Sequence, residues 1–209
     1  MVVGRSTALG AVLACTAFAA VYAAAANTPA ARTASSGAGC GSGRWQVKTM
    51  TDAAAASVNL SPRTTTVAAL RRLPAPKSPR RTRIKGVETT TYRVAARLVK
   101  MGLERDGDVL LVVVDPKTHG KLVVEFPASA CIRGASNKVQ PLMRNARAAL
   151  VAACGAPDRG SFTRVGGQAT ITGVGFFESG DGVSDAAPNG IELHPVLGFR
   201  MTECSLGAG

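Results

Sequence analysis

The sequence contains few of the residues from which metal centres and base-stacking surfaces are built. Its 209 residues include 2 histidines, 1 tryptophan, 2 tyrosines and 6 phenylalanines. Two histidines exclude a multi-histidine metal site, and the scarcity of aromatic side chains leaves little surface for stacking the bases of a single strand. Cys-x-x-Cys and Cys-x-x-His spacings are absent, as are a nucleophile elbow, a P-loop, a zinc-protease helix and an EF-hand loop. The sequence therefore does not indicate these common hydrolase, nucleotide-binding and metal-binding classes.

From residue 89 onward, the sequence follows a strand-strand-strand-helix-strand-strand order. Apolar and β-branched runs are separated by turn residues such as Asp106-Gly107-Asp108. Pro141 begins a helix with apolar residues on one face, and Gly155 ends it. The predicted elements are strands 89–101, 109–115, 121–126, 168–177 and 191–201, with the helix at 141–154. This is the order of a five-stranded OB-type barrel, so we predict a mainly β fold with one helix.

Residues 1–26 have the layout of a secretory signal peptide. Arg5 precedes an uncharged run that ends in Ala24-Ala25-Ala26, a typical cleavage sequence. An alanine-rich membrane anchor is the alternative, because about 20 apolar residues can span a bilayer, and a lipoprotein site at Cys15 is a third option. We therefore expect a secreted or envelope-associated protein, which contacts a membrane only if this segment is not cleaved.

The remainder of the chain is long enough for one domain with its own core. Residues 27–43 are rich in Ala, Ser, Thr and Gly, a composition typical of a flexible tether. We predict an OB-type barrel preceded by an extended N-terminal arm. The expected boundaries are signal peptide 1–26, tether 27–43, N-terminal arm and basic loop 44–87, barrel 88–203 and tail 204–209.

Four cysteines remain after removal of the signal peptide, namely Cys40, Cys131, Cys154 and Cys204. An even number of cysteines in a chain bound for an oxidising compartment predicts two disulfides. Three pairings are possible. We favour Cys131 with Cys154, which flank the helix, and Cys40 with Cys204, which would join the N-terminal segment to the tail. Each bond would contribute on the order of 3 kcal/mol by constraining the unfolded chain.

Positive charge is concentrated in one part of the chain. Residues 61–105 hold twelve Lys and Arg against two acidic residues. Within them, residues 74–86 combine basic residues with three prolines, which predicts an exposed loop. This loop is either a solvated surface or a contact for a polyanion, whether nucleic acid, anionic lipid or an acidic envelope polymer. The expected electrostatic footprint consists of Arg71, Arg72, Arg80, Arg81, Arg83, Arg93 and Arg97.

The passage 187–196 contains the most distinctive polar residues. Glu192 and His194 alternate with apolar residues in the last strand, so both project from the same face of the sheet. They form either a hydrogen-bonded pair on the solvent face or a metal-ligand or acid/base pair, since a carboxylate beside an imidazole raises its basicity. Together with Asn189, they are the polar groups that we expect to give a binding site its specificity.

Acidic residues cluster around the second and third strands. Asp106, Asp108, Asp115 and Glu125 either stabilise turns, where Asp is common, or form a calcium-type oxygen site or a general base. The second interpretation leads to an alternative function, a metal-assisted phosphodiesterase that uses Asp108, Asp115 and Glu125 around a divalent cation.

Five stretches of the chain carry a resemblance to a known family. They are residues 44–49, 106–112, 124–127, 172–177 and 187–196. The region that they mark, from about Cys40 to Phe199, resembles an uncharacterised family of exported bacterial proteins. That family often carries a His-Gly-Gln segment where this chain has residues 179–184, so a possible third histidine is missing here. The resemblance implies the domain boundaries and export; the family has no activity to carry over.

The chain also resembles thermonucleases, secreted calcium-dependent nucleases with an OB barrel. Gly107-Asp108 matches the Gly-Asp pair of their first hairpin, and the stretch 125–129 lies where they have an Asp-Thr-Pro-x-Glu motif. The second Glu of that motif and an arginine within the third strand are missing, so the positions that clamp phosphate and orient water are only partly filled.

The leading hypothesis from the sequence is a secreted, disulfide-bonded, basic OB-type binding module for an anionic ligand, with no cofactor. The first alternative is the phosphodiesterase or nuclease, which would require calcium. The second is a structural envelope protein without a ligand.

Overall fold

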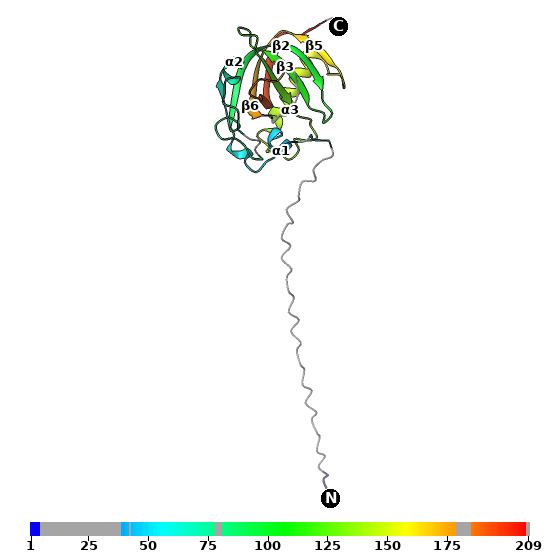
Figure 1. Ribbon diagram of the computed structural model, residues 1–209. Helices are drawn as coiled ribbons and strands as arrows, with labels where there is room; N and C mark the ends of the chain where they lie inside the picture. The colour runs from blue at the N-terminus through cyan, green and yellow to red at the C-terminus, as the bar shows by residue number, and fades with distance from the viewer. Residues whose placement is uncertain (5–38, 42, 78–80, 179–184, 208–209) are drawn as a thin grey trace. The chain divides into compact units, whose positions relative to one another are not determined.

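Five strands close into a barrel around a single apolar core (Figure 1), seen here in a computed structural model. The structure describes residues 1–4, 39–41, 43–77, 81–178 and 185–207. The fold described below is that of the compact unit Ala34–Gly209. The barrel strands are β2 (Thr90–Leu103), β3 (Val109–Val114), β4 (Lys121–Phe126), β6 (Gln168–Phe177) and β7 (Ile191–Met201). Their order is β3-β4-β7-β6-β2, and pairing of β2 with β3 closes the barrel. The β4–β7 pair is parallel and the other pairs are antiparallel. This confirms the predicted OB-type barrel.

The strands form where side chains alternate between the core and the outer face. In β2, Val94 and Ala96 are buried inside, while Arg93 and Arg97 point outward and are exposed. By contrast, β3 is apolar throughout, because other parts of the chain also cover its outer face. The outer face of β3 and β4 is therefore not a solvated sheet surface.

Helix α3 (Gln140–Cys154) packs against β7 with one apolar face. Pro141 lies in its first turn, where proline needs no backbone partner, and Gly155 ends it with a φ of 80°. The buried residues Met143, Ala146 and Leu150 recur at helical spacing.

Residues 44–87, predicted as an arm with a basic loop, contain short elements that the sequence analysis did not predict. Strand β1 pairs in parallel with β2, and outside this segment β5 pairs with both β2 and β8. The additional elements are α1 (Trp45–Lys48), the 3-10 helix η1 (Ala55–Ser57), β1 (Asn59–Thr64), α2 (Val67–Leu70), β5 (Phe162–Gly166) and β8 (Ser205–Leu206). These elements are too short to produce a clear periodic pattern.

All four predicted cysteines form disulfides, but the favoured pairing was wrong. Cys40 bonds to Cys131, and Cys154 bonds to Cys204. Helix α3 separates Cys131 from Cys154, and its 15 residues extend over about 22 Å at 1.5 Å per residue. Residues 132–139 form turns at the start of the helix, where Gln140 donates to the carbonyls of Ile132 and Arg133, and do not run back along it. Cys131 therefore stays at the opposite end of the helix from Cys154, farther away than the roughly 5.5 Å between Cα atoms that a disulfide needs.

Most of the predicted signal peptide and most of the predicted tether fall within residues 5–38, outside the described residues. In the part of the chain that the structure does describe, no helix has the length and apolar character needed to cross a membrane.

Candidate functional site

Four ionisable side chains meet on the outer face of β3, β4 and β7, opposite the barrel core. Asp108 directly precedes β3, Glu125 lies near the end of β4, and Glu192 and His194 lie two residues apart in β7. The register places Glu125 beside Leu110, and Glu192 beside Val123, so all four project from the same face. We refer to Asp108, Glu125, Glu192 and His194 as the carboxylate–histidine cluster.

The imidazole of His194 lies at the centre of the cluster. Its Nδ1 is 3.0 Å from Oε2 of Glu125 and 4.0 Å from Oε2 of Glu192, and its Nε2 is 3.4 Å from Oδ2 of Asp108. Despite these short distances, neither ring nitrogen has the alignment of a hydrogen bond, and Oε2 of Glu192 also has no hydrogen-bond partner. The other oxygen of Asp108, Oδ1, accepts a hydrogen bond of 2.7 Å from the backbone N–H of Ala128.

The cluster is buried, with exposed fractions of 0% for His194 and 3% for Glu192. The prediction that this pair could lie on the solvent face was therefore wrong. The N-terminal segment provides part of the cover: Arg44 lies 4.6 Å from the centroid of the Phe176 ring, which in turn contacts the His194 ring at 5.8 Å. The adjacent phenylalanines Phe176 and Phe177 are both buried. Phe177 belongs to the barrel core, whereas Phe176 packs against His194.

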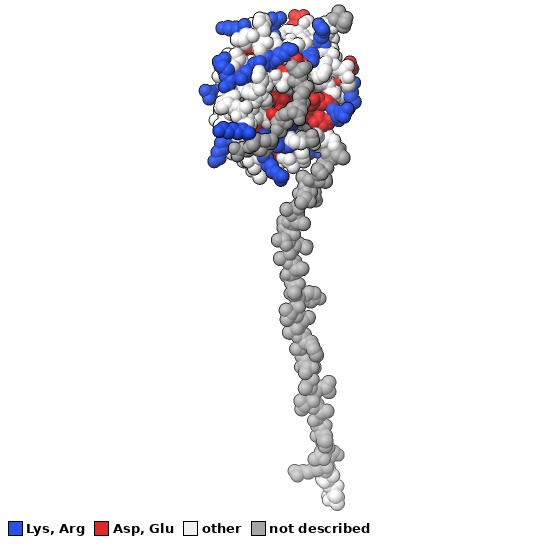
Figure 2. All heavy atoms as spheres, in the orientation of Figure 1, with Lys and Arg blue, Asp and Glu red and all other residues white. Residues whose placement is uncertain are grey.

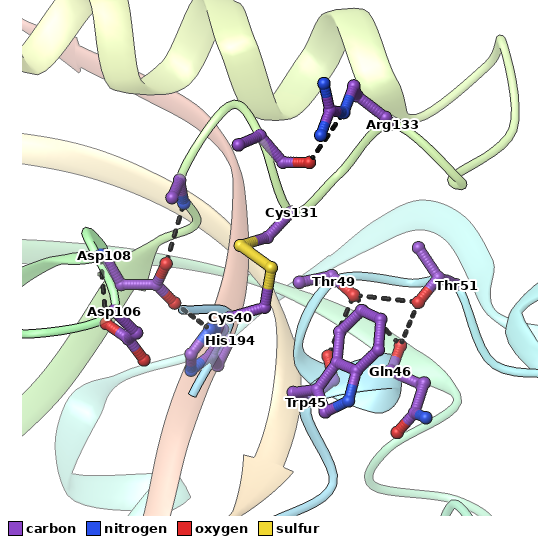
Figure 3. The surroundings of a disulfide bond; sticks show 12 residues. Cys40, Trp45, Gln46, Thr49, Thr51, Asp106, Asp108, Cys131, Arg133 and His194 are labelled. Atoms are coloured by element: carbon purple, nitrogen blue, oxygen red, sulfur yellow. Dashed lines mark hydrogen bonds and ion pairs between the residues drawn. A yellow bond between two sulfur atoms is a disulfide. The ribbon is translucent and has the colours of Figure 1, made fainter. Parts of the chain in front are cut away.

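The Cys40–Cys131 disulfide attaches the N-terminal segment next to the cluster. Figure 3 shows this bond beside His194 and Asp108. At Gly41, the next residue, a Cβ atom would lie 2.5 Å from Oδ2 of Asp106, and φ is 83°. Glycine is therefore required at position 41 for the N-terminal segment to pass this close to Asp106.

The charged groups of the cluster shift one another's pKa values. Burial alone would lower the pKa of His194, but Glu125 and Asp108 raise it to about 10. Burial would raise the pKa of Glu125, but the positive charge of His194 lowers it. Burial and the neighbouring Glu125 both raise the pKa of Glu192. Within the cluster, the positive charge of His194 therefore favours the ionised form of Glu125, whereas burial beside Glu125 disfavours the ionised form of Glu192.

Lys48 supplies a second positive charge near the cluster. Burial opposes its charge, but Glu125, Glu178 and Glu192 together hold its pKa above the usual range for lysine. Its Nζ is ion-paired with Glu178 and lies 5.2 Å from the centroid of the Phe176 ring.

Glu104 gives this region a testable pH dependence. Burial and the charges of Glu125 and Asp106 raise its pKa from 4.5 to about 7. A carboxyl with a raised folded-state pKa stabilises the fold below its unfolded pKa, and this contribution is lost as pH rises through the folded value. We therefore expect Glu104→Gln to raise the melting temperature at pH 8 and to leave it nearly unchanged at pH 4. A melting-temperature series from pH 4 to 8 measures this, with the exposed Glu203→Gln as the control. An equal shift at both pH values would contradict it.

Asp115, which was also proposed from the sequence, makes its contacts outside the carboxylate–histidine cluster. Oδ1 of Asp115 accepts hydrogen bonds from the backbone N–H groups of Lys117 and Thr118, and its Oδ2 accepts one from Ala68. These donors outweigh burial and lower the pKa of Asp115. Asp115 follows the end of β3, about 23 Å of extended chain from Asp108. The structure thus brings Asp108 and Glu125 together and places Asp115 apart from them.

Asn189 connects two elements. Its side-chain N–H groups donate to the carbonyl oxygens of Leu70 and Leu73, at 3.0 and 2.9 Å, and its Oδ1 accepts from Ile191. These contacts hold the end of α2 against the start of β7.

The arginines of the expected footprint do not form one surface. Arg83 is buried and donates through two nitrogens to the carboxylate of Asp52, at 3.0 and 2.7 Å, so the prediction of a wholly exposed basic loop was wrong at this residue. Arg71 donates to the carbonyl of Lys121. Arg72 and Arg81 are exposed, and Arg80 lies outside the described residues. On the face shown in Figure 2, Lys and Arg side chains are spread around the edge, and Asp and Glu gather nearer the middle.

Arg93 does lie at a cavity. A groove of about 650 Å³ crosses the outer face of β2, β6 and β7, with β1 on one side and α3 on the other. Its lining residues are Leu60, Pro62, Thr91, Arg93, Leu142, Asn145, Ala146, Ala149, Thr170, Thr172, Leu197, Gly198, Phe199 and Arg200. Among the described residues that line the groove, none is acidic. We call this cavity the arginine–threonine groove.

The strand register builds the floor of the groove. Arg93 pairs with Thr172, which pairs with Gly198, and Thr170 pairs with Arg200, so hydroxyl and guanidinium groups alternate across three strands. Gly198 has no side chain to fill the space. Near the end of the groove, Oγ1 of Thr91 is buried and has no hydrogen-bond partner.

A search of family models, of curated proteins and of solved structures finds no match to this chain. The class of the protein is therefore defined by the structure itself, as an OB-type barrel with two disulfides.

The sequence analysis identified Glu192, His194, Asp108 and Glu125 but did not bring them into one site. It missed Arg200, Thr170 and Thr172 as parts of a groove. Outward-pointing threonine and arginine at alternate positions of the last two strands was the available signal.

Proposed function

We propose that this protein is an exported, basic OB-type module that binds an anionic ligand in the arginine–threonine groove. The supporting observation is a cavity whose described lining residues include two exposed arginines, Arg93 and Arg200, and several hydroxyl groups but no carboxylate. Guanidinium groups donate paired hydrogen bonds that match phosphate, sulfate and carboxylate oxygens. The net charge of +12 adds a long-range attraction for a polyanion.

Export fits the same proposal. The two disulfides are stable in oxidising compartments, and the signal-like residues 1–26 would direct the chain there. We propose that the chain belongs with the exported bacterial proteins that its sequence resembles.

The groove suits the backbone of an anionic polymer better than stacked bases. Phe199 is the single aromatic residue of its lining, and it is 5% exposed. Single-strand binders of this fold rely on exposed aromatic side chains. Arg97 extends the row of exposed arginines along β2 beyond the groove.

Neutralising the groove arginines should weaken binding more than neutralising the basic loop. We expect Arg93→Gln and Arg200→Gln each to weaken binding of a labelled sulfated polysaccharide or single-stranded oligonucleotide about tenfold or more, since a hydrogen bond to a charged group contributes roughly 1.5 kcal/mol or more. Fluorescence anisotropy over a salt series measures this.

Two exposed residues outside the groove lining serve as matched controls, Arg81→Gln in the basic loop and Lys138→Gln before α3. Both should bind nearly as the wild type does. Equal losses of affinity in all four variants would indicate that binding depends on net charge alone. A larger loss of affinity in Arg81→Gln would show that the binding site lies in the basic loop. Absence of binding to any polyanion would favour the structural envelope role.

The alternative of a calcium-dependent phosphodiesterase has less support. It requires Asp108, Asp115 and Glu125 around one cation, and Asp115 is held apart by its backbone contacts. In addition, Asp108 and Glu125 are each 5% exposed, which leaves a phosphodiester little access to them.

A further inference from the structure

We propose that the carboxylate–histidine cluster binds one divalent first-row transition-metal ion, of the Zn²⁺ or Mn²⁺ class, through Asp108, Glu125 and His194. This site is separate from the arginine–threonine groove and does not depend on the function proposed for it.

The first argument is the convergence of donor atoms. Asp108, Glu125 and His194 each offer one ligand atom, and these atoms all lie within 4.8 Å of one another. They come from three adjacent strands of a closed barrel, which fixes their backbones. Ligands of a tetrahedral ion lie roughly 3.3 Å apart, so modest side-chain rotations would complete the site.

The second argument is that buried donor atoms in the cluster have no hydrogen-bond partner. Oε2 of Glu192 has no hydrogen-bond partner, and the two ring nitrogens of His194 face carboxylate oxygens in ion pairs that lack hydrogen-bond alignment. The side chains of Glu192 and His194 are 3% and 0% exposed. Buried polar atoms are nearly always satisfied, and a bound ion is one of the recognised reasons for an exception. Asp108 has one oxygen occupied by Ala128 and the other, Oδ2, directed at His194.

The arrangement of the imidazole also suits a metal ligand. A ligating histidine commonly directs its second ring nitrogen at a carboxylate, which orients the ring. His194 has a carboxylate oxygen near each nitrogen, Glu125 at Nδ1 and Asp108 at Nε2. If Nε2 binds the ion beside Asp108, Nδ1 can donate its N–H to Oε2 of Glu192, which leaves Glu125 available as a ligand. Glu192 adds a further oxygen 4.0 Å from Nδ1.

The donor set indicates the kind of ion. Imidazole with carboxylates suits Zn²⁺ and Mn²⁺, whereas Ca²⁺ and Mg²⁺ prefer oxygen ligands alone. Lys48 does not occupy the position of the ion, because its Nζ is ion-paired with Glu178.

The test measures Mn²⁺ binding by electron paramagnetic resonance on disulfide-intact protein that has been stripped with a chelator. We expect one Mn²⁺ per chain, displaced by Zn²⁺ but not by a roughly tenfold excess of Ca²⁺. Glu125→Gln and His194→Gln should each weaken Mn²⁺ binding by about tenfold or more. Asp115→Asn, which removes a buried carboxylate outside the cluster, is the matched control and should bind as the wild type does.

Circular dichroism and thermal melting show which variants fold. If His194→Gln does not fold, Glu125→Gln and Asp108→Asn, which preserve side-chain shape, provide the same comparison. Absence of Mn²⁺ and Zn²⁺ binding by the wild type would overturn the proposal. Unchanged binding in the folded cluster variants would also overturn it, because the ion would then lie elsewhere. Equal competition by Ca²⁺ would overturn the role assigned to His194.

Discussion

Replacement of Glu88 by alanine is expected to destabilise the fold by about 3–5 kcal/mol, the cost typical of breaking a buried ion pair. Glu88 is 0% exposed and pairs with Arg44. It also accepts hydrogen bonds from the backbone N–H groups of Ile84, at 2.6 Å, and Phe177, at 3.0 Å. Its loss would leave two backbone donors without partners and would remove the carboxylate that neutralises Arg44, whose guanidinium would keep its hydrogen bond to the carbonyl of Phe177. Urea unfolding followed by circular dichroism measures the change.

A double-mutant cycle identifies the cause of this loss. Arg44→Met combined with Glu88→Ala should cost clearly less than the sum of the two single changes, because the double variant leaves no unpaired buried charge. Glu203→Ala removes an exposed glutamate and should change stability by less than about 0.5 kcal/mol. A Glu88→Ala variant within about 1 kcal/mol of the wild type would show that the ion pair contributes little to stability.

Removal of the Cys40–Cys131 disulfide, by changing both cysteines to alanine, is the second large expected effect. The bond closes a loop of 91 residues, for which the chain-entropy relation gives about 4.6 kcal/mol. A local effect is expected as well, because the bond attaches the segment that contains Trp45 beside the carboxylate–histidine cluster (Figure 3). Trp45 is the single tryptophan of the chain, so its fluorescence reports on this segment alone.

The other disulfide provides the matched control. Removing Cys154–Cys204, which closes a loop of 50 residues, should cost about 4 kcal/mol by the same relation but leave the native environment of Trp45 unchanged. Acrylamide should therefore quench Trp45 more strongly only in the native Cys40→Ala/Cys131→Ala variant. Equal quenching in both variants would show that the first disulfide does not hold the N-terminal segment in place.

The barrel could be predicted from the sequence because its strands are long and strongly patterned. Strand β6 has the bounds predicted, and β2 and α3 differ from prediction by one or two residues at their ends. These elements depend on local periodicity and on turn residues such as Gly107, both of which can be read from the chain. The short elements β1, β5 and β8 form only because a neighbouring strand is available for pairing.

The candidate sites depend on contacts that no local pattern contains. Strand alternation correctly placed Glu192 and His194 on one face, but the sequence could not show that the N-terminal segment covers that face. For the same reason Arg83, within a basic and proline-rich stretch, appeared exposed, although it pairs with Asp52, 31 residues earlier. The arginine–threonine groove likewise depends on the register between β2, β6 and β7.

Nuclear magnetic resonance mapping of an anionic oligomer on the protein tests the central claim most directly. Titration of a short sulfated oligosaccharide into isotope-labelled protein should shift the backbone amide signals of Arg93, Thr170, Thr172 and Gly198, and the shifts should diminish as salt is added. Shifts confined to residues 81–87, or to the outer face of β3 and β4, would contradict binding in the arginine–threonine groove.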